Sequence, residues 1–173
     1  MRWMWIDRVV ELVPRERLVA IKHVSLAEEH LHDHFPAVGS RPAMPIMPAC
    51  FIVEGMAQSA GILVGHAEGF REKVVLAKVS KAELHAEAVP GDTLRYTATI
   101  EQFSDAGASC RGVVERIDPR EPAQAAEIGQ IDLMFSHLDQ NLGGMTFPEH
   151  NFVFSESFRT LLRTSGIEMP TTA

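Results

Sequence analysis

The chain has 173 residues, of which 46% are hydrophobic and 23% charged, values typical of one soluble globular domain with a sizeable core. The formal net charge of -7 argues against nucleic-acid binding, which needs clustered Lys and Arg to neutralise phosphates. The two cysteines, Cys50 and Cys110, are too few for a disulfide framework, so a reducing cytoplasm is the predicted location.

The first half of the chain predicts a strand, a loop and a long helix. Residues 17–25 are rich in β-branched and apolar side chains, which is typical of a strand. Four prolines make residues 33–48 a loop. Pro48 suits the first turn of a helix, which we expect to end near Gly65–Gly69. This helix is apolar nearly all round and therefore central and buried, and its apolar run falls short of the ~20 residues of a membrane span.

The second half predicts antiparallel strands. Within residues 93–103, apolar and polar side chains alternate, so one face of that segment is expected to lie in the core. The predicted strands cover residues 74–88, 93–103, 109–117 and 123–138. One strand, a buried helix and about four further strands indicate an α+β fold in which a curved sheet wraps a long helix.

Two regions are predicted along the chain. The α+β domain covers residues 1–138. Residues 139–173 form a partly irregular C-terminal extension, with a chain-breaking segment at 141–144 and one short helix at about 155–163.

The predicted central helix carries one carboxylate, Glu54, and no other Asp, Glu, Lys, Arg or His lies between Pro48 and Gly65. Burial favours the neutral form of a carboxylate, which can act as a general acid. Gln58 lies one helical turn later, so its amide is expected to hold the Glu54 carboxyl in one orientation. A carboxylate that is simply satisfied within the core is the alternative.

A histidine precedes this helix in the proline-rich loop. Pro36 fixes its own φ and biases Phe35 towards extended backbone, so His34 is expected on a stiff segment. Because histidine takes up and returns a proton near neutral pH, His34 and Glu54 together predict a base and an acid that face one substrate.

The start of the helix supplies hydrogen-bond donors. The free backbone N–H groups of Ala49 and Cys50, directly after Pro48, are expected to polarise a carbonyl oxygen. We interpret the Cys50 side chain as a small buried thiol rather than a nucleophile.

A metal site is the weaker alternative. His30, His32 and His34 alternate, as they would on one face of a metal-binding strand. The remaining histidines suggest no further ligands at coherent spacing, so we predict neither a metal nor a cofactor.

Four motifs in register resemble the β-hydroxyacyl-(acyl carrier protein) dehydratases of hot-dog fold. They are His34-Phe35-Pro36, residues 45–48 (PIMP), residues 52–58 (IVEGMAQ) and residues 89–92 (VPGD). The similarity covers about residues 3–138. Members of that family remove water from a 3-hydroxyacyl thioester to give the trans-2-enoyl product.

The resemblance implies a role for each candidate residue. His34 would take the proton from the carbon next to the thioester carbonyl, and Glu54 would protonate the departing hydroxyl. The predicted substrate-binding residues are Pro48, Ala49, Cys50 and Gln58. The resemblance further implies a homodimer or a larger assembly (a dimer of dimers or a trimer of dimers), in which each site takes His34 and Glu54 from different subunits and an apolar tunnel holds the acyl chain.

The sequence departs from the family pattern in three places. Loop 37–44 is longer, Ala37 and Ala49 replace glycines, and residues 82–88 lack the basic character expected to attract an acidic carrier protein. The carrier is therefore either acyl carrier protein or coenzyme A. Two other functions share the fold: a thioesterase in which Glu54 activates water, and a non-catalytic acyl-thioester-binding subunit.

Overall fold

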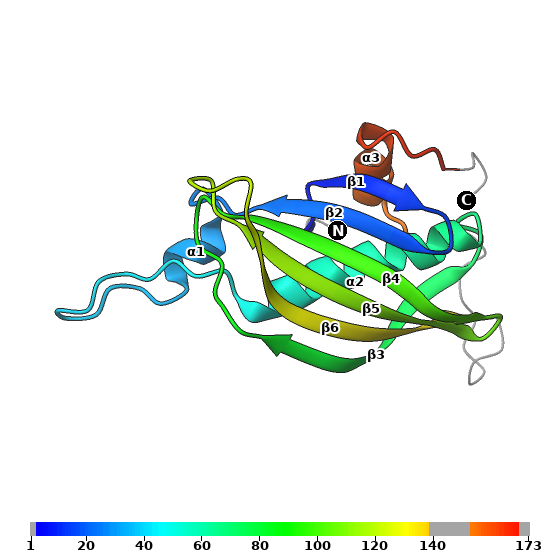
Figure 1. Cartoon of the computed structure of the whole chain (residues 1–173), viewed down its shortest axis with the longest axis horizontal. Coiled ribbons are helices and arrows are strands. Elements are labelled where there is room, and N and C mark those ends of the chain that lie inside the picture. Colours follow the sequence, from blue (N-terminus) through cyan, green and yellow to red (C-terminus); the bar gives the residue numbers. More distant parts are fainter. Residues whose placement is uncertain (1–2, 139–152, 170–173) are drawn as a thin grey trace.

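A six-stranded sheet is curved around one long helix (Figure 1). The computed structural model describes residues 3–138 and 153–169; the predicted chain break at 141–144 lies outside them. The elements are β1 (Arg8–Val13), β2 (Arg17–His23), α1 (Glu29–Asp33), α2 (Ala49–Ala67), β3 (Lys73–Leu84), β4 (Thr93–Ser104), β5 (Gly107–Ile117), β6 (Ala125–Leu138) and α3 (Glu156–Thr164).

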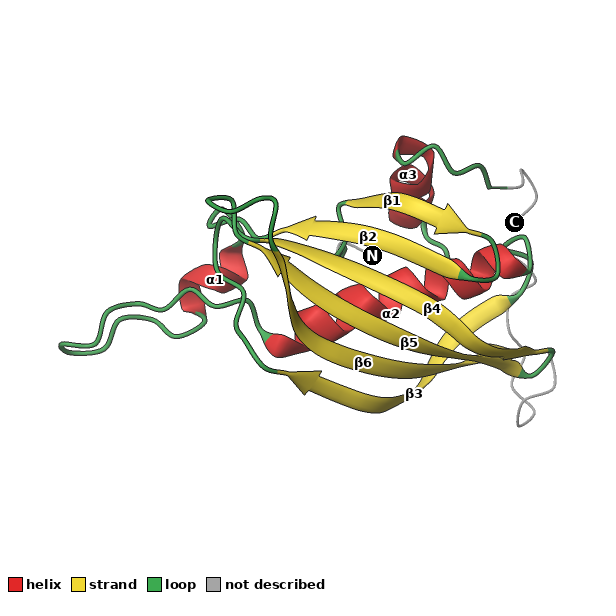
Figure 2. Ribbon diagram, viewed as in Figure 1, coloured by secondary structure: helices red, strands yellow, loops and turns green. Residues whose placement is uncertain are grey.

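The sheet is antiparallel, with the strand order β1-β2-β4-β5-β6-β3. Figure 2 shows α2 lying along the inner side of the curved sheet. The alternation predicted in β4 is confirmed over residues 93–98, because the side chains of Leu94, Tyr96 and Ala98 are fully buried; Ile100, on the same face, is only partly buried. The predicted α+β hot-dog architecture is therefore confirmed.

Two elements escape the sequence-based prediction. β1 was not expected as a strand; its register shifts between Val9 and Glu11 and its burial pattern does not alternate, so the period of two that marks a half-buried strand is lost. α1 is a five-residue helix inside a stretch without predicted structure.

The central helix α2 begins after Pro48, as predicted. By length and composition alone this 19-residue helix is apolar enough to cross a membrane, although 61% of its apolar window is buried inside the protein. Contacts with β2, β3, β4, β5 and β6 explain its apolar character. We therefore interpret α2 as the core helix of the domain.

A pair of glycines on α2 gives a stability test. A Cβ at Gly55 would lie 2.6 Å from Tyr96 Oη and 2.8 Å from the Trp5 carbonyl oxygen, whereas a Cβ at Gly61 would approach only Phe135 Cε1, at 3.6 Å. We expect Gly55→Ala to lower the free energy of unfolding by about 1–3 kcal/mol through overpacking. The matched change Gly61→Ala should raise it by up to about 1 kcal/mol, since Ala favours the helix. Urea denaturation measures both, and a Gly55→Ala protein as stable as the wild type would contradict this packing.

The helix α3 of the C-terminal extension shares the core of the domain. Phe154, Phe158, Leu161 and Leu162 are buried in the same apolar cluster as α2 and the sheet. Arg8 in β1 donates a hydrogen bond to the carbonyl oxygen of Thr164, at 3.1 Å. The predicted helix at 155–163 is thus confirmed, within one residue, as Glu156–Thr164. The division of the chain at residue 138 stays a prediction.

Candidate active site

His34 lies at the C-terminal end of α1, on the edge of an open cleft. Its Nδ1 is hydrogen-bonded to the backbone carbonyl of Ile46, which lies on the far side of the long loop. A carbonyl only accepts, so Nδ1 carries the hydrogen in the neutral ring and Nε2 keeps its lone pair. The contact therefore leaves Nε2 as a proton acceptor.

The loop after His34 folds back on itself. Phe35 has a φ of 61°, so the predicted extended backbone at this residue is wrong. The Met44 N–H donates to the Phe35 carbonyl at 2.9 Å, and Val38 and Arg41 form a bridge closer to the tip. The extra residues of the loop project away from the sheet (Figure 1), and its two ends stay close enough for His34 to reach Ile46.

The start of α2 opens into the same cleft. The cleft has a volume of about 480 Å³ and is lined in part by His34, Ala49 and Ile52. The first N–H groups of a helix have no intrahelical acceptors, and because the N-cap residue is Pro48, no N-cap side chain accepts from them here. Ala49 and Cys50 are exposed. His34 and Ala49 therefore share one cleft, whereas Pro48 and Cys50 are not among the residues that line it, and the roles assigned to all four stay predictions.

Two polar residues of this cleft were missed by the sequence analysis. His85 and Glu87 line the cleft together with His34 and Ala49. The sequence offered one signal, since both residues lie directly before the turn at 89–92. In the fold, the Met47 N–H donates a hydrogen bond to the Ala88 carbonyl, at 2.8 Å, and this contact brings the segment beside the loop.

Glu54 is held by Gln58, as predicted. Gln58 Nε2 donates to Glu54 Oε1 at 3.0 Å and to the Trp3 carbonyl at 2.8 Å, while Gln58 Oε1 accepts from the Trp5 N–H at 2.9 Å. Gln58 is only 5% exposed, so these contacts fix its amide. Glu54 itself is half-buried in the single chain, which corrects the expectation of a fully buried carboxylate, because one side of α2 faces an open groove.

His34 and Glu54 line different cavities of one chain. Glu54 and Gln58 border a groove of about 250 Å³ between α2 and β3, and His34 borders the cleft at the start of α2. Within residues 3–138 and 153–169, no described cavity holds both. One chain thus places the two candidate catalytic residues in separate cavities, and both their roles and their pairing stay predictions.

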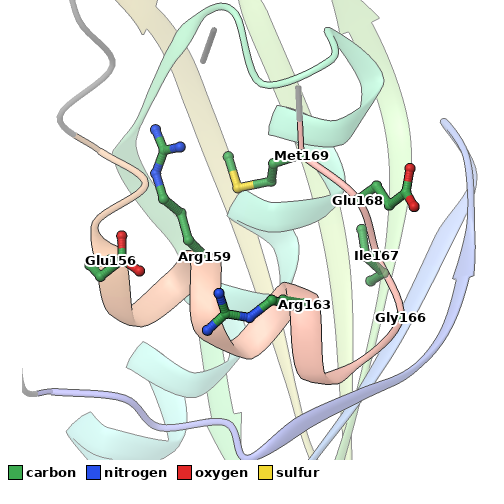
Figure 3. Close-up of a pocket in the computed structure, with 7 residues that line it drawn as sticks. All are labelled: Glu156, Arg159, Arg163, Gly166, Ile167, Glu168 and Met169. Atoms are coloured by element: carbon green, nitrogen blue, oxygen red, sulfur yellow. The ribbon is translucent and has the colours of Figure 1, made fainter. Parts of the chain in front are cut away.

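A larger cleft, of about 530 Å³, lies on α3 and contains neither group. Figure 3 shows two arginines and two glutamates at its border. They are Glu156, Arg159, Arg163 and Glu168. This cleft contains none of the candidate site residues, which line the two smaller cavities beside α2.

The two cysteines differ from one another in their exposure. Cys50 is exposed and Cys110 is buried, so the interpretation of Cys50 as a buried thiol is wrong. Cys50 lies in the first turn of α2, before the helix passes under the sheet. Burial raises the pKa of the Cys110 thiol to about 12.

We expect iodoacetamide at pH 8 to alkylate Cys50 and to spare Cys110. Only the thiolate reacts, and a pKa raised from 9.0 to about 12 lowers the thiolate fraction of Cys110 about a thousandfold. Mass spectrometry of tryptic peptides measures both sites, and Cys50→Ser is the control. Equal labelling of the folded protein at both cysteines would contradict the burial of Cys110.

The histidines near the loop do not form the face that a metal site needs. His30 and His32 lie on helix α1 rather than on a strand. The His30 ring packs edge-on against Trp5 and Phe51, at centroid distances of 5.0 and 4.9 Å, and burial lowers its pKa. Over the described part of the chain, no group of three or more His, Cys, Asp or Glu side chains is arranged to hold a metal ion.

Solved structures with this architecture define the class. The dehydratase heterocomplex ApeI:P from Xenorhabdus doucetiae superposes with a TM-score of 0.57 at 14% identity, over 80% of this chain and 85% of that one. An acyl-CoA hydrolase from Staphylococcus aureus, in complex with butyryl coenzyme A, gives a TM-score of 0.54 at 14% identity, over 72% and 67%. At such identities the likeness concerns the fold, which is that of the hot-dog proteins.

Sequence comparison then gives the family. The FabA-like domain matches residues 2–115. The 3-hydroxyacyl-[acyl-carrier-protein] dehydratase FabZ of Acidiphilium cryptum is 42% identical over 103 residues, or 58% of this chain and 59% of that protein. FabZ of Rickettsia bellii is 35% identical over 102 residues, or 58% and 66%. The chain belongs to the FabA-like dehydratase family of hot-dog fold, and it spans less than two thirds of either relative.

Proposed function

We propose that this protein dehydrates 3-hydroxyacyl thioesters to trans-2-enoyl thioesters in fatty-acid synthesis or a related acyl-chain synthesis. One observation carries the proposal. Gln58 holds Glu54 at the border of a groove that is otherwise mostly apolar, and a histidine with a free Nε2 lies beside the open start of the same helix. An acid, a base and carbonyl-polarising donors are the groups that this elimination needs.

The proposed reaction assigns one step to each group. His34 Nε2 takes a proton from C2 of the acyl chain, and the negative charge moves to the thioester oxygen, where the N–H groups of Ala49 and Cys50 stabilise it. Glu54 Oε1 accepts from Gln58, so Oε2 is left to carry the proton. That proton goes to the C3 hydroxyl, which leaves as water as the C2–C3 double bond forms.

The separate half-sites support a dimer in which His34 works with Glu54 of the partner subunit. β3 ends the sheet and pairs with β6 along one side only. Its exposed residues include Leu76 and Val79, at 41% and 40% exposure. An apolar strand at a sheet edge favours pairing with a second chain, and pairs of such dimers or trimers of them give the larger assemblies.

The carrier of the acyl chain is acyl carrier protein or coenzyme A. The curated relatives are named for acyl carrier protein, and the Staphylococcus hydrolase is bound to butyryl coenzyme A. The proposed chemistry uses side chains and backbone donors, so it requires no cofactor. A cytoplasmic location agrees with two unpaired cysteines, one of them exposed.

Incubation of the purified protein with 3-hydroxydecanoyl coenzyme A tests the activity. We expect the ultraviolet absorbance of the enoyl thioester to rise without release of free thiol. Release of free thiol would identify a thioesterase instead. Neither product, with this substrate or with the acyl-carrier-protein thioester, would identify an acyl-binding subunit and overturn the proposal.

A further inference from the structure

The groove beside Glu54 changes from polar to apolar along its length. Glu54 and Gln58 form its polar end on α2, and the opposite wall consists of Val74, Val75 and Leu76 of β3. Gly61 lies seven residues, or about 10 Å, further along the helix axis, where the missing side chain leaves room beside the Phe135 ring. This gradient suits a ligand with a polar head and an apolar tail.

The far wall of the groove comes from the C-terminal extension. Val153, Phe154 and Phe158 line the groove together with α2 and β3. Phe154 lies against Gly65, so closely that a Cβ there would meet its ring at 2.4 Å. Gly65 is eleven residues, or about 16 Å, beyond Glu54 along α2. The aromatic wall therefore stands at the end of the groove distant from the acid.

The aromatic wall is firmly built. Phe154 and Phe158 are 4% and 8% exposed. The Phe154 ring packs edge-on against Phe70 and Phe158, at centroid distances of 5.0 and 6.0 Å. Phe154 and Phe158 lie beyond residue 115, where the match to the FabA-like domain ends, as does β6. The wall is thus built by residues outside the matched range.

We propose that the C-terminal extension closes the acyl groove and sets the longest acyl chain that the protein accepts. The inference rests on the proposed function, which places the reacting carbons beside Glu54 and directs the tail of the substrate along α2. The distance from Glu54 to the aromatic wall sets the limit. Acyl chains that end before Phe154 and Phe158 fit along the groove, and longer chains meet these two rings.

Two variants test the proposal in opposite directions. Phe158→Ala removes part of the wall and should shift the preference to longer chains. Gly61→Val places two methyl groups in the groove and should shift it to shorter ones. Leu161→Ala is the matched control, because Leu161 is buried on the same helix but is not among the residues that line the groove. Thermal melting confirms that each variant is folded, and Gly61→Val keeps the test valid if Phe158→Ala unfolds.

The substrates are 3-hydroxyacyl thioesters of N-acetylcysteamine, with acyl chains from butanoyl to hexadecanoyl. Because this small thiol replaces the carrier, docking of a carrier cannot affect the result. In Phe158→Ala, kcat/KM for chains above the wild-type limit should rise about fourfold for each methylene newly buried. The saturated acyl thioesters, which have no 3-hydroxyl and cannot be dehydrated, give Kd by calorimetry and should show the same shift.

The two measurements separate the inference from the function. If the wild type and both variants share one chain-length profile in Kd, the inference is overturned, whether or not dehydration occurs. If Kd shifts as expected and no enoyl product forms from any substrate, the groove binds acyl chains and the proposed dehydratase activity fails. A shift in Leu161→Ala equal to that in Phe158→Ala would also overturn the inference, because the wall would then have no special role.

Discussion

Glu54→Gln is expected to lower kcat for enoyl formation by about a hundredfold or more, because an amide has no proton to give to the departing hydroxyl. The substitution keeps the size of the side chain. Its amide oxygen can still accept the hydrogen bond that Gln58 Nε2 donates to Glu54 Oε1. The loss should therefore fall on the chemical step and leave the folded structure intact.

The matched control is Glu156→Gln. Glu156 is an exposed carboxylate at the border of the larger cleft (Figure 3). Enoyl absorbance gives kcat for both variants, and near-ultraviolet circular dichroism with thermal melting reports on the fold. We expect wild-type turnover from Glu156→Gln. Near-normal turnover from a folded Glu54→Gln protein would remove Glu54 from the mechanism, and loss of turnover in Glu156→Gln would move the chemistry to α3.

Most of the fold could be predicted because its elements carry local signals. The first half of β4 alternates residue by residue between buried and less buried positions, and α2 combines an initial proline with an apolar surface. β1 carries no such signal. It is an edge strand with a register shift, and only its pairing with β2 makes it a strand.

The candidate site likewise contains features that local sequence predicts and features that it does not. The hydrogen bond between Gln58 and Glu54 follows from helical geometry at a spacing of four residues, so the sequence predicts it. The left-handed backbone of Phe35 depends on a hydrogen bond with Met44 across the loop. The exposure of Cys50 depends on where the sheet stops covering α2. Neither feature can be predicted from neighbouring residues.

The aromatic wall of the groove could not be predicted either, because it depends on contacts between residues that are distant in sequence. Phe154 and Gly65 are far apart in sequence, and only the path of the extension brings them together. The sequence predicts the short helix α3 but not the surface against which that helix packs. Sequence patterns thus predict the candidate reacting groups, whereas the proposed limit on acyl-chain length depends on tertiary contacts.

His34→Ala is expected to lower kcat by about a hundredfold or more, because no base is left to take the C2 proton. His32→Ala is the matched control. His32 is exposed on the same short helix, and its Nε2 is hydrogen-bonded to the Leu26 carbonyl at 2.8 Å, so its loss should leave turnover unchanged. Full turnover in a folded His34→Ala protein would contradict the assignment of the base.

Mixing the two inactive proteins tests how the half-sites combine. If His34 works with Glu54 of the partner subunit, a dimer of one Glu54→Gln chain and one His34→Ala chain contains one intact site and one doubly altered site. Random pairing of equal amounts then restores roughly a quarter of the wild-type turnover, because half of the two-fold symmetric dimers are mixed. Co-refolding of the two variants, followed by the enoyl assay, measures this fraction.

If the mixture stays as inactive as its components, although tagged chains prove that mixed dimers form, both groups must act within one chain. The separate cavities of His34 and Glu54 would then have to merge before catalysis.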